Sequence, residues 1–215
     1  MLTKGAGRRR APARRARSVG RPAREPVRAA ILDAARRLCF EHGSAAVTAR
    51  KVAAEVGCSA TAIYLYYRSI DHLLHLLRLE GHALLAEHLR RPPATLHAAL
   101  RLCAMQDEYL RFGLEHPRYF GLMFPVRLGE GPSLEVGREE AATLLVVRDA
   151  AALGIERGEL RRDLDPLVIA NHCWLAVHGL TATAVSGHLR FTAPGVDAVA
   201  LVEQIKRATA AWLRV

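Results

Sequence analysis

Hydrophobic residues recur at helical spacing along the chain from residue 26 onward. Ile31, Ala35 and Leu38 follow one another at intervals of three and four residues, which places them on one face of a helix that Gly43 ends. No segment alternates apolar and polar residues as a half-buried strand does. The sequence therefore predicts an all-α fold of about nine helices.

Capping and helix-breaking residues set the predicted helix ends. Ser69 begins a long helix that the pair at 92–93, two prolines, stops. Asp165 followed by Pro166 is a strong start signal, because an acidic N-cap and a proline at the first helical position both suit a helix N-terminus. After the first helix, the predicted segments are 48–56, 59–67, 69–91, a helix ending at 116, an aromatic segment at 117–124, then 134–157, 166–187 and 194–213, with a Gly/Pro-rich loop at 129–132.

Positive charge is concentrated at the N-terminal end. Residues 1–28 hold ten of the 31 Lys and Arg residues and one acidic residue, Glu25, so the isoelectric point of 10.2 belongs to this end of a nearly neutral chain. Residues 1–24 show no hydrophobic period, which predicts a disordered basic tail. Two interpretations of the tail stay open: a solvated extension, or an arm that adds sequence-independent phosphate contacts.

The rest of the composition narrows the class of protein. The four cysteines lie far apart without a CxxC pair, which predicts reduced thiols and a cytoplasmic location. No apolar run reaches the roughly 18 residues of a membrane span, and the N-terminus lacks the apolar core of a secretory signal. We find no glycine-rich phosphate loop, Ser-His-Asp arrangement or paired carboxylates, so we expect neither an enzyme nor a cofactor.

The stretch from residue 48 to 67 carries the functional prediction. Ala53, Gly57 and Ile63 stand at the spacing Ala-x3-Gly-x5-Ile. A small residue lets two short helices cross closely, and glycine can adopt the left-handed conformation that a tight turn requires. The pattern predicts a helix-turn-helix whose second helix keeps an outer face free for the major groove of DNA. An ordinary helical hairpin is the alternative.

The surrounding sequence resembles the N-terminal domain of the TetR family of regulators. The resemblance rests on VTARKVAAEVGCSATAIYLYYRSIDHLLHLL, preceded by ILDAARRLCFEHG, and covers about residues 25–85. It implies that a threonine at the start of the second helix meets a phosphate, that the first residues of the third helix read base edges, and that Tyr67 packs inward. The residues for which it implies a DNA contact are Thr48, Arg50, Lys51, Ser59, Ala60, Thr61, Tyr64, Tyr66 and Arg68.

The sequence also departs from the family pattern. Ile70 stands where a phosphate-binding lysine is usual, so Arg68, His72 or the basic tail would supply that charge. The recognition helix itself contains no Arg, Lys, Asn or Gln for paired hydrogen bonds to a base. Readout would then depend on Thr61, Arg50, contacts to thymine methyl groups and DNA shape.

Residues 93–213 resemble the C-terminal domain of one TetR subgroup, named for its Trp, His and Gly. The resemblance rests on EHPRYFGLMF and on CWLAVHGLTAT, in which these residues are Trp174, His178 and Gly179. It implies a cavity for an unidentified small-molecule ligand, although aromatic residues and methionines at helical spacing are also typical of an ordinary core. The residues predicted to line the cavity are Met105, Tyr109, Phe112, Tyr119, Phe120, Met123, Phe124, Leu145, Trp174 and His178.

The helix predicted at 166–187 is apolar nearly all round and rich in small residues, so other helices must cover more than one side of it. Together with the last helix, and with the same pair from a second chain, it would form a twofold four-helix interface, as is usual in the family. A homodimer would present two recognition helices to two half-sites of a near-palindrome. The residues predicted at this interface are Ala170, Val177, Ala184, Val199, Val202, Ile205 and Trp212.

The leading prediction is a transcriptional regulator, more often a repressor in this family, that binds a double-stranded DNA operator as a homodimer and is released by a ligand. The main alternative is a sequence-independent nucleic-acid binder driven by the arginine-rich tail. A binding protein that has lost its DNA contacts is a further one. Several histidines lie along the predicted helix 69–91, but without Asp, Glu or Cys at ligand spacing we predict no metal site.

Overall fold

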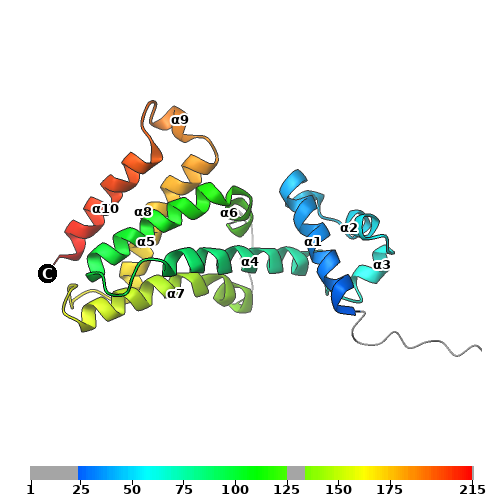
Figure 1. Cartoon of the computed structure of the whole chain (residues 1–215), viewed down its shortest axis with the longest axis horizontal. Helices are drawn as coiled ribbons and strands as arrows, with labels where there is room; N and C mark the ends of the chain where they lie inside the picture. The colour runs from blue at the N-terminus through cyan, green and yellow to red at the C-terminus, as the bar shows by residue number, and fades with distance from the viewer. Residues whose placement is uncertain (1–23, 125–133, 215) are drawn as a thin grey trace, which may run out of the picture.

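The computed structural model describes residues 24–124 and 134–214 (Figure 1). Regular structure in these two stretches consists of ten α-helices and one 3-10 turn, without a strand, which confirms the all-α prediction of about nine helices. The predicted tail, apart from Arg24, and the loop predicted at 129–132 lie outside the described residues. The elements are α1 (Arg24–His42), η2 (Ser44–Ala46), α2 (Ala49–Val56), α3 (Ala60–Ile63), α4 (Ile70–Arg90), α5 (Ala98–Glu115), α6 (Pro117–Met123), α7 (Leu134–Glu156), α8 (Pro166–Val185), α9 (Leu189–Thr192) and α10 (Ala198–Leu213).

Side-chain caps fix the starts of three long helices. The Ser69 hydroxyl accepts a hydrogen bond from the backbone of α4 at 3.0 Å, and Asp165 accepts one from the backbone of α8 at 2.6 Å. The last helix begins at Ala198 rather than at residue 194, because Asp197 is its N-cap and Gly195, with φ at 75°, turns the chain just before it. The additional helix α9 lies in the segment between α8 and this turn.

The helices enclose two hydrophobic cores, and α4 belongs to both. Leu73 and Leu77 of α4 are buried in the first core, together with residues of α1, α2 and α3. Leu85 and Leu89, further along α4, are buried in the second core with residues of α5 to α8 and α10. Figure 1 shows α4 running from the N-terminal helices into the C-terminal bundle. The predicted domain boundary between residues 85 and 93 stays a prediction. Because α4 contributes side chains to both cores, a movement of this helix would affect both.

Helix α8 has the length and hydropathy of a membrane span, which corrects the expectation that no segment would reach this measure. It packs against α5, α7 and α10, and its residues Ile169, Cys173 and Val177 are buried among them. The core helix of a water-soluble protein has the same features, so this finding alone is weak support for a membrane location.

Candidate nucleic-acid interface and ligand cavity

Helices α2 and α3 form the predicted helix-turn-helix. Thr48 is the N-cap of α2, and its side chain accepts a hydrogen bond from the backbone N–H of Lys51 at 3.3 Å. Gly57 ends α2 in the left-handed conformation (φ 75°, ψ 34°), where Cys58 N–H donates to the Ala53 carbonyl at 3.0 Å. Because other residues adopt this conformation only with strain, the turn depends on glycine.

The recognition helix is shorter than predicted, since α3 covers Ala60–Ile63 rather than residues 59–67. Ser59 caps it by accepting a backbone hydrogen bond at 3.2 Å. The next three residues continue in tight turns with backbone hydrogen bonds between residues three apart. This winding allows Ile63 and Tyr67, which are 0% and 2% exposed, both to reach the first core.

Tyr67 anchors the end of the motif and packs inward as predicted. Its hydroxyl donates a hydrogen bond to the carbonyl of Arg28 on α1 at 2.8 Å, and the guanidinium of Arg28 lies 5.4 Å from the ring centroid. Burial raises the pKa of the Tyr67 hydroxyl, so the hydroxyl stays protonated as a donor. These contacts fix the position of α3 and its exposed residues relative to α1.

The residues predicted to contact DNA are accessible, with the partial exception of Tyr66, which packs against the first core. Leu65, which the sequence analysis did not select, is 80% exposed between two tyrosines. An exposed apolar side chain at this position has the chemistry that contacts a thymine methyl group. The exposed members of the predicted set are Thr48, Arg50, Lys51, Ser59, Ala60, Thr61, Tyr64 and Arg68.

Three cationic side chains of this motif, Arg50, Lys51 and Arg68, form no ion pair with any residue that the structure describes. Arg37 on α1, by contrast, is neutralised by Glu55 at 3.0 Å. Cations without an acidic partner attract phosphates more strongly than paired ones. The charge of the motif is therefore available to a polyanion.

His72 does not replace the lysine that is missing at Ile70. Its Nδ1 accepts a hydrogen bond from the backbone N–H of Arg68 at 3.4 Å. Burial and the neighbouring Arg68 lower the pKa of His72, so its ring is neutral near pH 7. Of the two described candidates for the missing charge, Arg68 stays the predicted one.

A cavity of about 240 Å³ lies within the C-terminal bundle, between α4, α5, α7, α8 and the end of α6. Five of the residues predicted from the sequence line it: Met105, Tyr109, Met123, Phe124 and Trp174. The remaining walls are mostly aliphatic, which is typical of a site for a small organic molecule. The wall residues that sequence reasoning missed are His82, Leu85, Leu89, Leu102, Gln106, Ala141, Thr143, Leu144, Val147, Cys173 and Val177.

The other residues predicted for the cavity lie elsewhere. Phe112 is fully buried in the core, and Leu145 is 39% exposed on the outside of α7. Tyr119 bonds to Glu80 on α4, while Phe120 and His178 pack against each other with ring centroids 5.4 Å apart. Most of these residues are aromatic, as are several wall residues, so residue type alone did not show which of them line the cavity.

The polar groups around the cavity are mostly engaged with one another. Trp174 Nε1–H donates to the Tyr109 hydroxyl at 3.1 Å, and this hydroxyl is hydrogen-bonded to His178 Nδ1 at 2.8 Å. Burial lowers the pKa of His178, which favours the neutral ring. Gln106 Nε2 donates to the Cys173 carbonyl at 3.2 Å, while its buried Oε1 has no hydrogen-bond partner among the residues that the structure describes.

Helix α6 contacts both cores. Tyr119 donates a hydrogen bond to Glu80 Oε2 at 3.0 Å, and Glu80 also binds Arg36 of α1 at 2.9 Å. Leu122 is buried in the first core. Met123, the next residue, lines the cavity. Helix α6 therefore contacts both the cavity and the helices that support the helix-turn-helix.

The predicted dimer face needs correction at three positions. Ala170, Val177 and Val202 are at most 2% exposed within the single chain, so their side chains cannot reach a second chain. Ala184, Ile205 and Trp212 are partly buried against the second core. Val199 alone of the predicted set is largely exposed, at 54%.

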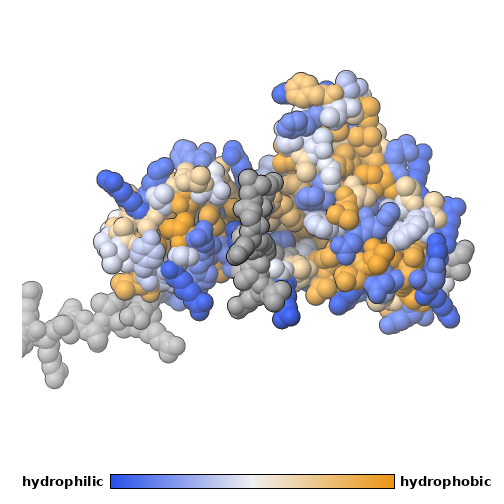
Figure 2. Space-filling view, turned by 180° about the vertical axis from the view of Figure 1, so that it is seen from behind, coloured by the Kyte–Doolittle hydropathy of each residue, from blue (hydrophilic) through white to orange (hydrophobic). Residues whose placement is uncertain are grey.

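A different face of α8 is open instead. Val168 and Leu175 are 53% and 61% exposed, and a Cβ on Gly179 would meet no atom within 4 Å. These three residues, spaced by seven and four, share one helix face. Figure 2 shows hydrophobic side chains reaching the surface over the C-terminal half of the molecule.

Two families match successive parts of this architecture. Residues 31–77 match the bacterial regulatory proteins of the tetR family, and residues 102–209 match the tetracyclin repressor-like C-terminal domain. The second match covers half of the chain. The chain belongs to the TetR family. It thus has a TetR-type helix-turn-helix domain followed by a TetR-type C-terminal domain, and the narrower subgroup named for Trp, His and Gly stays a prediction.

A curated relative and several solved structures are similar to this chain. The HTH-type transcriptional regulator Rv1816 of Mycobacterium tuberculosis is 37% identical over 146 residues, a match that spans 66% of this chain and 62% of the relative. A protein of unknown function from Rhodococcus sp. RHA1 has a similar fold, with a TM-score of 0.74 and 22% identity over 88% of this chain and 96% of that chain. So does the transcriptional regulator FadR from Bacillus subtilis in complex with stearoyl-CoA, with a TM-score of 0.66 and 18% identity over 86% and 99% of the two chains.

Proposed function

We propose that this TetR protein is a ligand-responsive repressor that binds a near-palindromic operator as a homodimer. The observation that carries the proposal is the exposed helix-turn-helix surface, whose three cations Arg50, Lys51 and Arg68 have no acidic partner among the described residues. Thr48 adds a helix N-terminus at the same surface, where backbone N–H groups favour a phosphate. We further propose a cytoplasmic location and no enzymatic activity.

The phosphate contacts set an expected result for DNA binding. In a gel-shift assay with DNA from upstream of its own coding sequence, the full chain is expected to form a specific complex that survives excess unrelated DNA. The paired variant Arg50→Ala with Lys51→Ala is expected to weaken this complex, because two phosphate contacts are lost. The slope of log K against the logarithm of the salt concentration should become shallower by about 0.9 for each lost contact. Both side chains are exposed, so the fold should be unaffected.

A chain that lacks residues 1–23 distinguishes the two functions that the sequence left open. If the helix-turn-helix carries recognition, the truncated chain still prefers the specific fragment, with lower overall affinity and a smaller salt slope. Loss of nearly all binding in the truncated chain, with no sequence preference in the full chain, would instead establish a tail-driven, sequence-independent binder.

The cavity indicates the class of ligand. Its wall contains no Lys, Arg, Asp or Glu among the described residues, and burying an unpaired carboxylate costs several kcal/mol. Among the described wall residues, Gln106 has a buried acceptor, Oε1, that forms no hydrogen bond with any other described residue. A volume of 240 Å³ corresponds to on the order of ten non-hydrogen atoms, at roughly 20–30 Å³ each. We propose an uncharged, mainly apolar molecule with one hydrogen-bond donor.

This ligand class can be tested with three probes of equal chain length. Binding of 1-decanol is expected to raise the melting temperature of the full chain and to reduce its operator complex, because only this probe is neutral and carries a donor. Sodium decanoate and decanoyl-CoA are expected to do neither. The variant Val147→Phe, which places a ring in the cavity wall, should lose the response to decanol while still binding DNA.

The opposite ranking of the probes would contradict the neutral-ligand proposal. The relative in complex with stearoyl-CoA makes decanoyl-CoA the informative competitor. A response to decanoyl-CoA alone would mean that a charged group binds outside the described wall and that only an acyl chain enters. DNA binding itself would be unaffected by that outcome, so the two parts of the proposal fail separately.

A further inference from the structure

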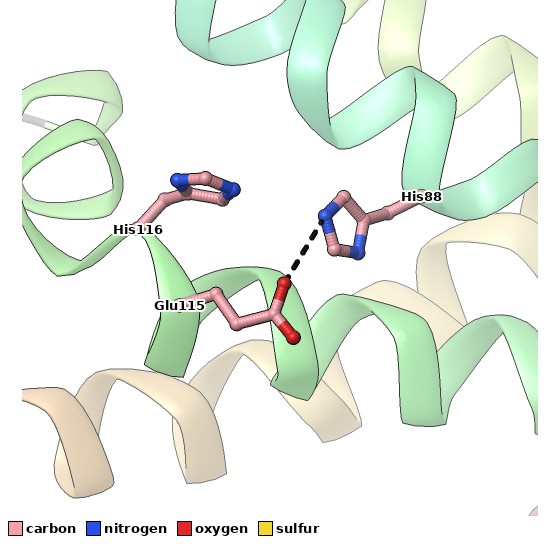
Figure 3. A group of neighbouring side chains, drawn as sticks. All are labelled: His88, Glu115 and His116. Carbon is pink, nitrogen blue, oxygen red and sulfur yellow. Dashed lines mark ion pairs between the residues drawn. The ribbon is translucent and has the colours of Figure 1, made fainter.

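Three side chains that commonly ligate metal ions meet where α4 passes the junction of α5 and α6 (Figure 3). His88 comes from α4, Glu115 is the last residue of α5, and His116 lies between α5 and α6. One ligand atom from each lies within 4.8 Å of the other two. The cluster belongs neither to the helix-turn-helix nor to the cavity wall. It escaped the sequence analysis because His88 is far from the other two along the chain.

Charged side chains surround Nδ1 of His88. His88 is 3% exposed, and its Nδ1 lies 3.1 Å from Oε2 of Glu108, which is itself 8% exposed. Arg91 and Arg111 bind the same carboxylate at 3.0 and 2.7 Å. Arg91 also lies 3.0 Å from Nδ1. Because a guanidinium only donates hydrogen bonds, Nδ1 can carry a proton for Glu108 only while Arg91 Nη1 bonds to the carboxylate, which it reaches at 3.0 Å, and not to Nδ1. The carboxylate then accepts the Nδ1 proton of His88, as acidic residues do behind many metal-bound histidines.

In that tautomer the free electron pair of His88 is on Nε2, which faces the other two residues in Figure 3. Nε2 lies 3.7 Å from Glu115 Oε2, which is too long for a hydrogen bond but close enough for both atoms to share a cation. Around a tetrahedral zinc ion with bonds of about 2.0–2.2 Å, neighbouring ligand atoms stand about 3.3–3.6 Å apart. The Glu115 side chain is 50% exposed and can turn inward by the difference.

We propose that His88, Glu115 and His116 bind a divalent transition-metal ion of the Zn²⁺ class, with water as the fourth ligand. Two imidazole nitrogens and one carboxylate oxygen are a donor set that suits zinc and disfavours Mg²⁺ and Ca²⁺, which prefer oxygen ligands. The ion would join α4 to the start of α6. Because α6 contacts Glu80 through Tyr119, bound metal would restrict the same helix that connects the cavity to the DNA-binding helices.

Zinc binding to the full, untagged, chelator-treated chain tests this proposal. Titration with Zn²⁺ by calorimetry is expected to give one ion per chain. Both Glu115→Gln and His116→Ala are expected to weaken the affinity for Zn²⁺ at least about tenfold. Loss of a residue that only hydrogen-bonds to a metal ligand already has an effect of this size. Both residues lie at the end of α5 and are more accessible than His88, which makes these variants safer for folding than a change at His88.

The matched control is His42→Ala, because His42 and Glu41 form an exposed His–Glu pair at the end of α1. Equal weakening by this control, absence of a stoichiometric ion, or unchanged affinity in Glu115→Gln and His116→Ala would overturn the proposal. The tetrahedral absorption bands of Co²⁺ in the unsubstituted chain, and their loss in His116→Ala, give a second readout that does not depend on affinity. DNA binding can be intact in each of these outcomes.

Discussion

Replacing Leu175 by arginine is expected to convert the proposed dimer to a monomer and to reduce operator affinity by about 10²–10⁴-fold. The side chain is 61% exposed in the single chain, so the substitution leaves the core of the monomer intact. We propose that the open face of α8, formed by Val168, Leu175 and Gly179, is the dimer interface. The arginine places a charge in this face, and burial of a charge without a partner opposes association. A dimer that contacts two half-sites at once binds DNA about 10²–10⁴-fold more tightly than one subunit on one half-site. A monomer loses this factor.

The measurement is size-exclusion chromatography with light scattering, followed by a gel shift on the same samples. Leu145→Arg is the matched control, because Leu145 is also an exposed leucine but lies on α7, outside the proposed interface. If Leu175→Arg stays dimeric with full operator affinity, the interface lies on another face. If both variants become monomeric, the effect is not specific to α8.

Replacing Gly113 by alanine is expected to lower the free energy of unfolding by about 2 kcal/mol. A Cβ at Gly113 would lie 2.2 Å from Cγ2 of Thr181, where α5 crosses α8. Thr181 cannot turn its methyl group away freely, because its hydroxyl donates to the Val177 carbonyl at 2.8 Å. The strain exceeds the roughly 1 kcal/mol that alanine gains over glycine within a helix. Thermal unfolding should show a melting temperature lower by about 4–8 °C.

Two further variants separate this clash from a general intolerance of substitution. Gly81→Ala meets Sδ of Met123 at 2.6 Å, but that side chain is flexible and can move, so little loss is expected. Thr181→Ser removes the obstructing methyl group and keeps the hydroxyl. Combined with Gly113→Ala it should recover part of the lost stability, with a coupling energy of at least about 0.5 kcal/mol. Strict additivity of the two changes would contradict the packing described for α5 and α8.

The helix-turn-helix could be predicted from the sequence because its determinants are local. Ala53, Gly57 and Ile63 act on neighbours within a few residues, and the caps Thr48 and Ser59 bond to the next turn of their own helices. The length of the recognition helix was the exception. Tyr67 is held by Arg28 of α1, a contact with a residue far away in the sequence, and so its effect on the local winding was not evident.

The cavity and the dimer face could be predicted only in outline, because both depend on which side of a helix faces which neighbour. Helix α8 is apolar nearly all round, so its pattern does not distinguish the buried Val177 from the exposed Leu175. Similarly, Phe120 and Phe124 are alike in sequence, yet only Phe124 reaches the cavity. Partners such as His82 and Thr143, whose side chains lie 3.0 Å apart, come from different helices and leave no local signal.

Hydroxyl-radical footprinting of the full chain on its operator fragment tests most directly whether two copies of α3 read two adjacent half-sites. We expect two protected segments related by twofold symmetry, with centres about 10–10.5 base pairs or a multiple of this spacing apart. Arg50→Ala with Lys51→Ala should remove both segments together. Protection spread evenly along the DNA, or a single segment without symmetry, would contradict recognition by a dimer.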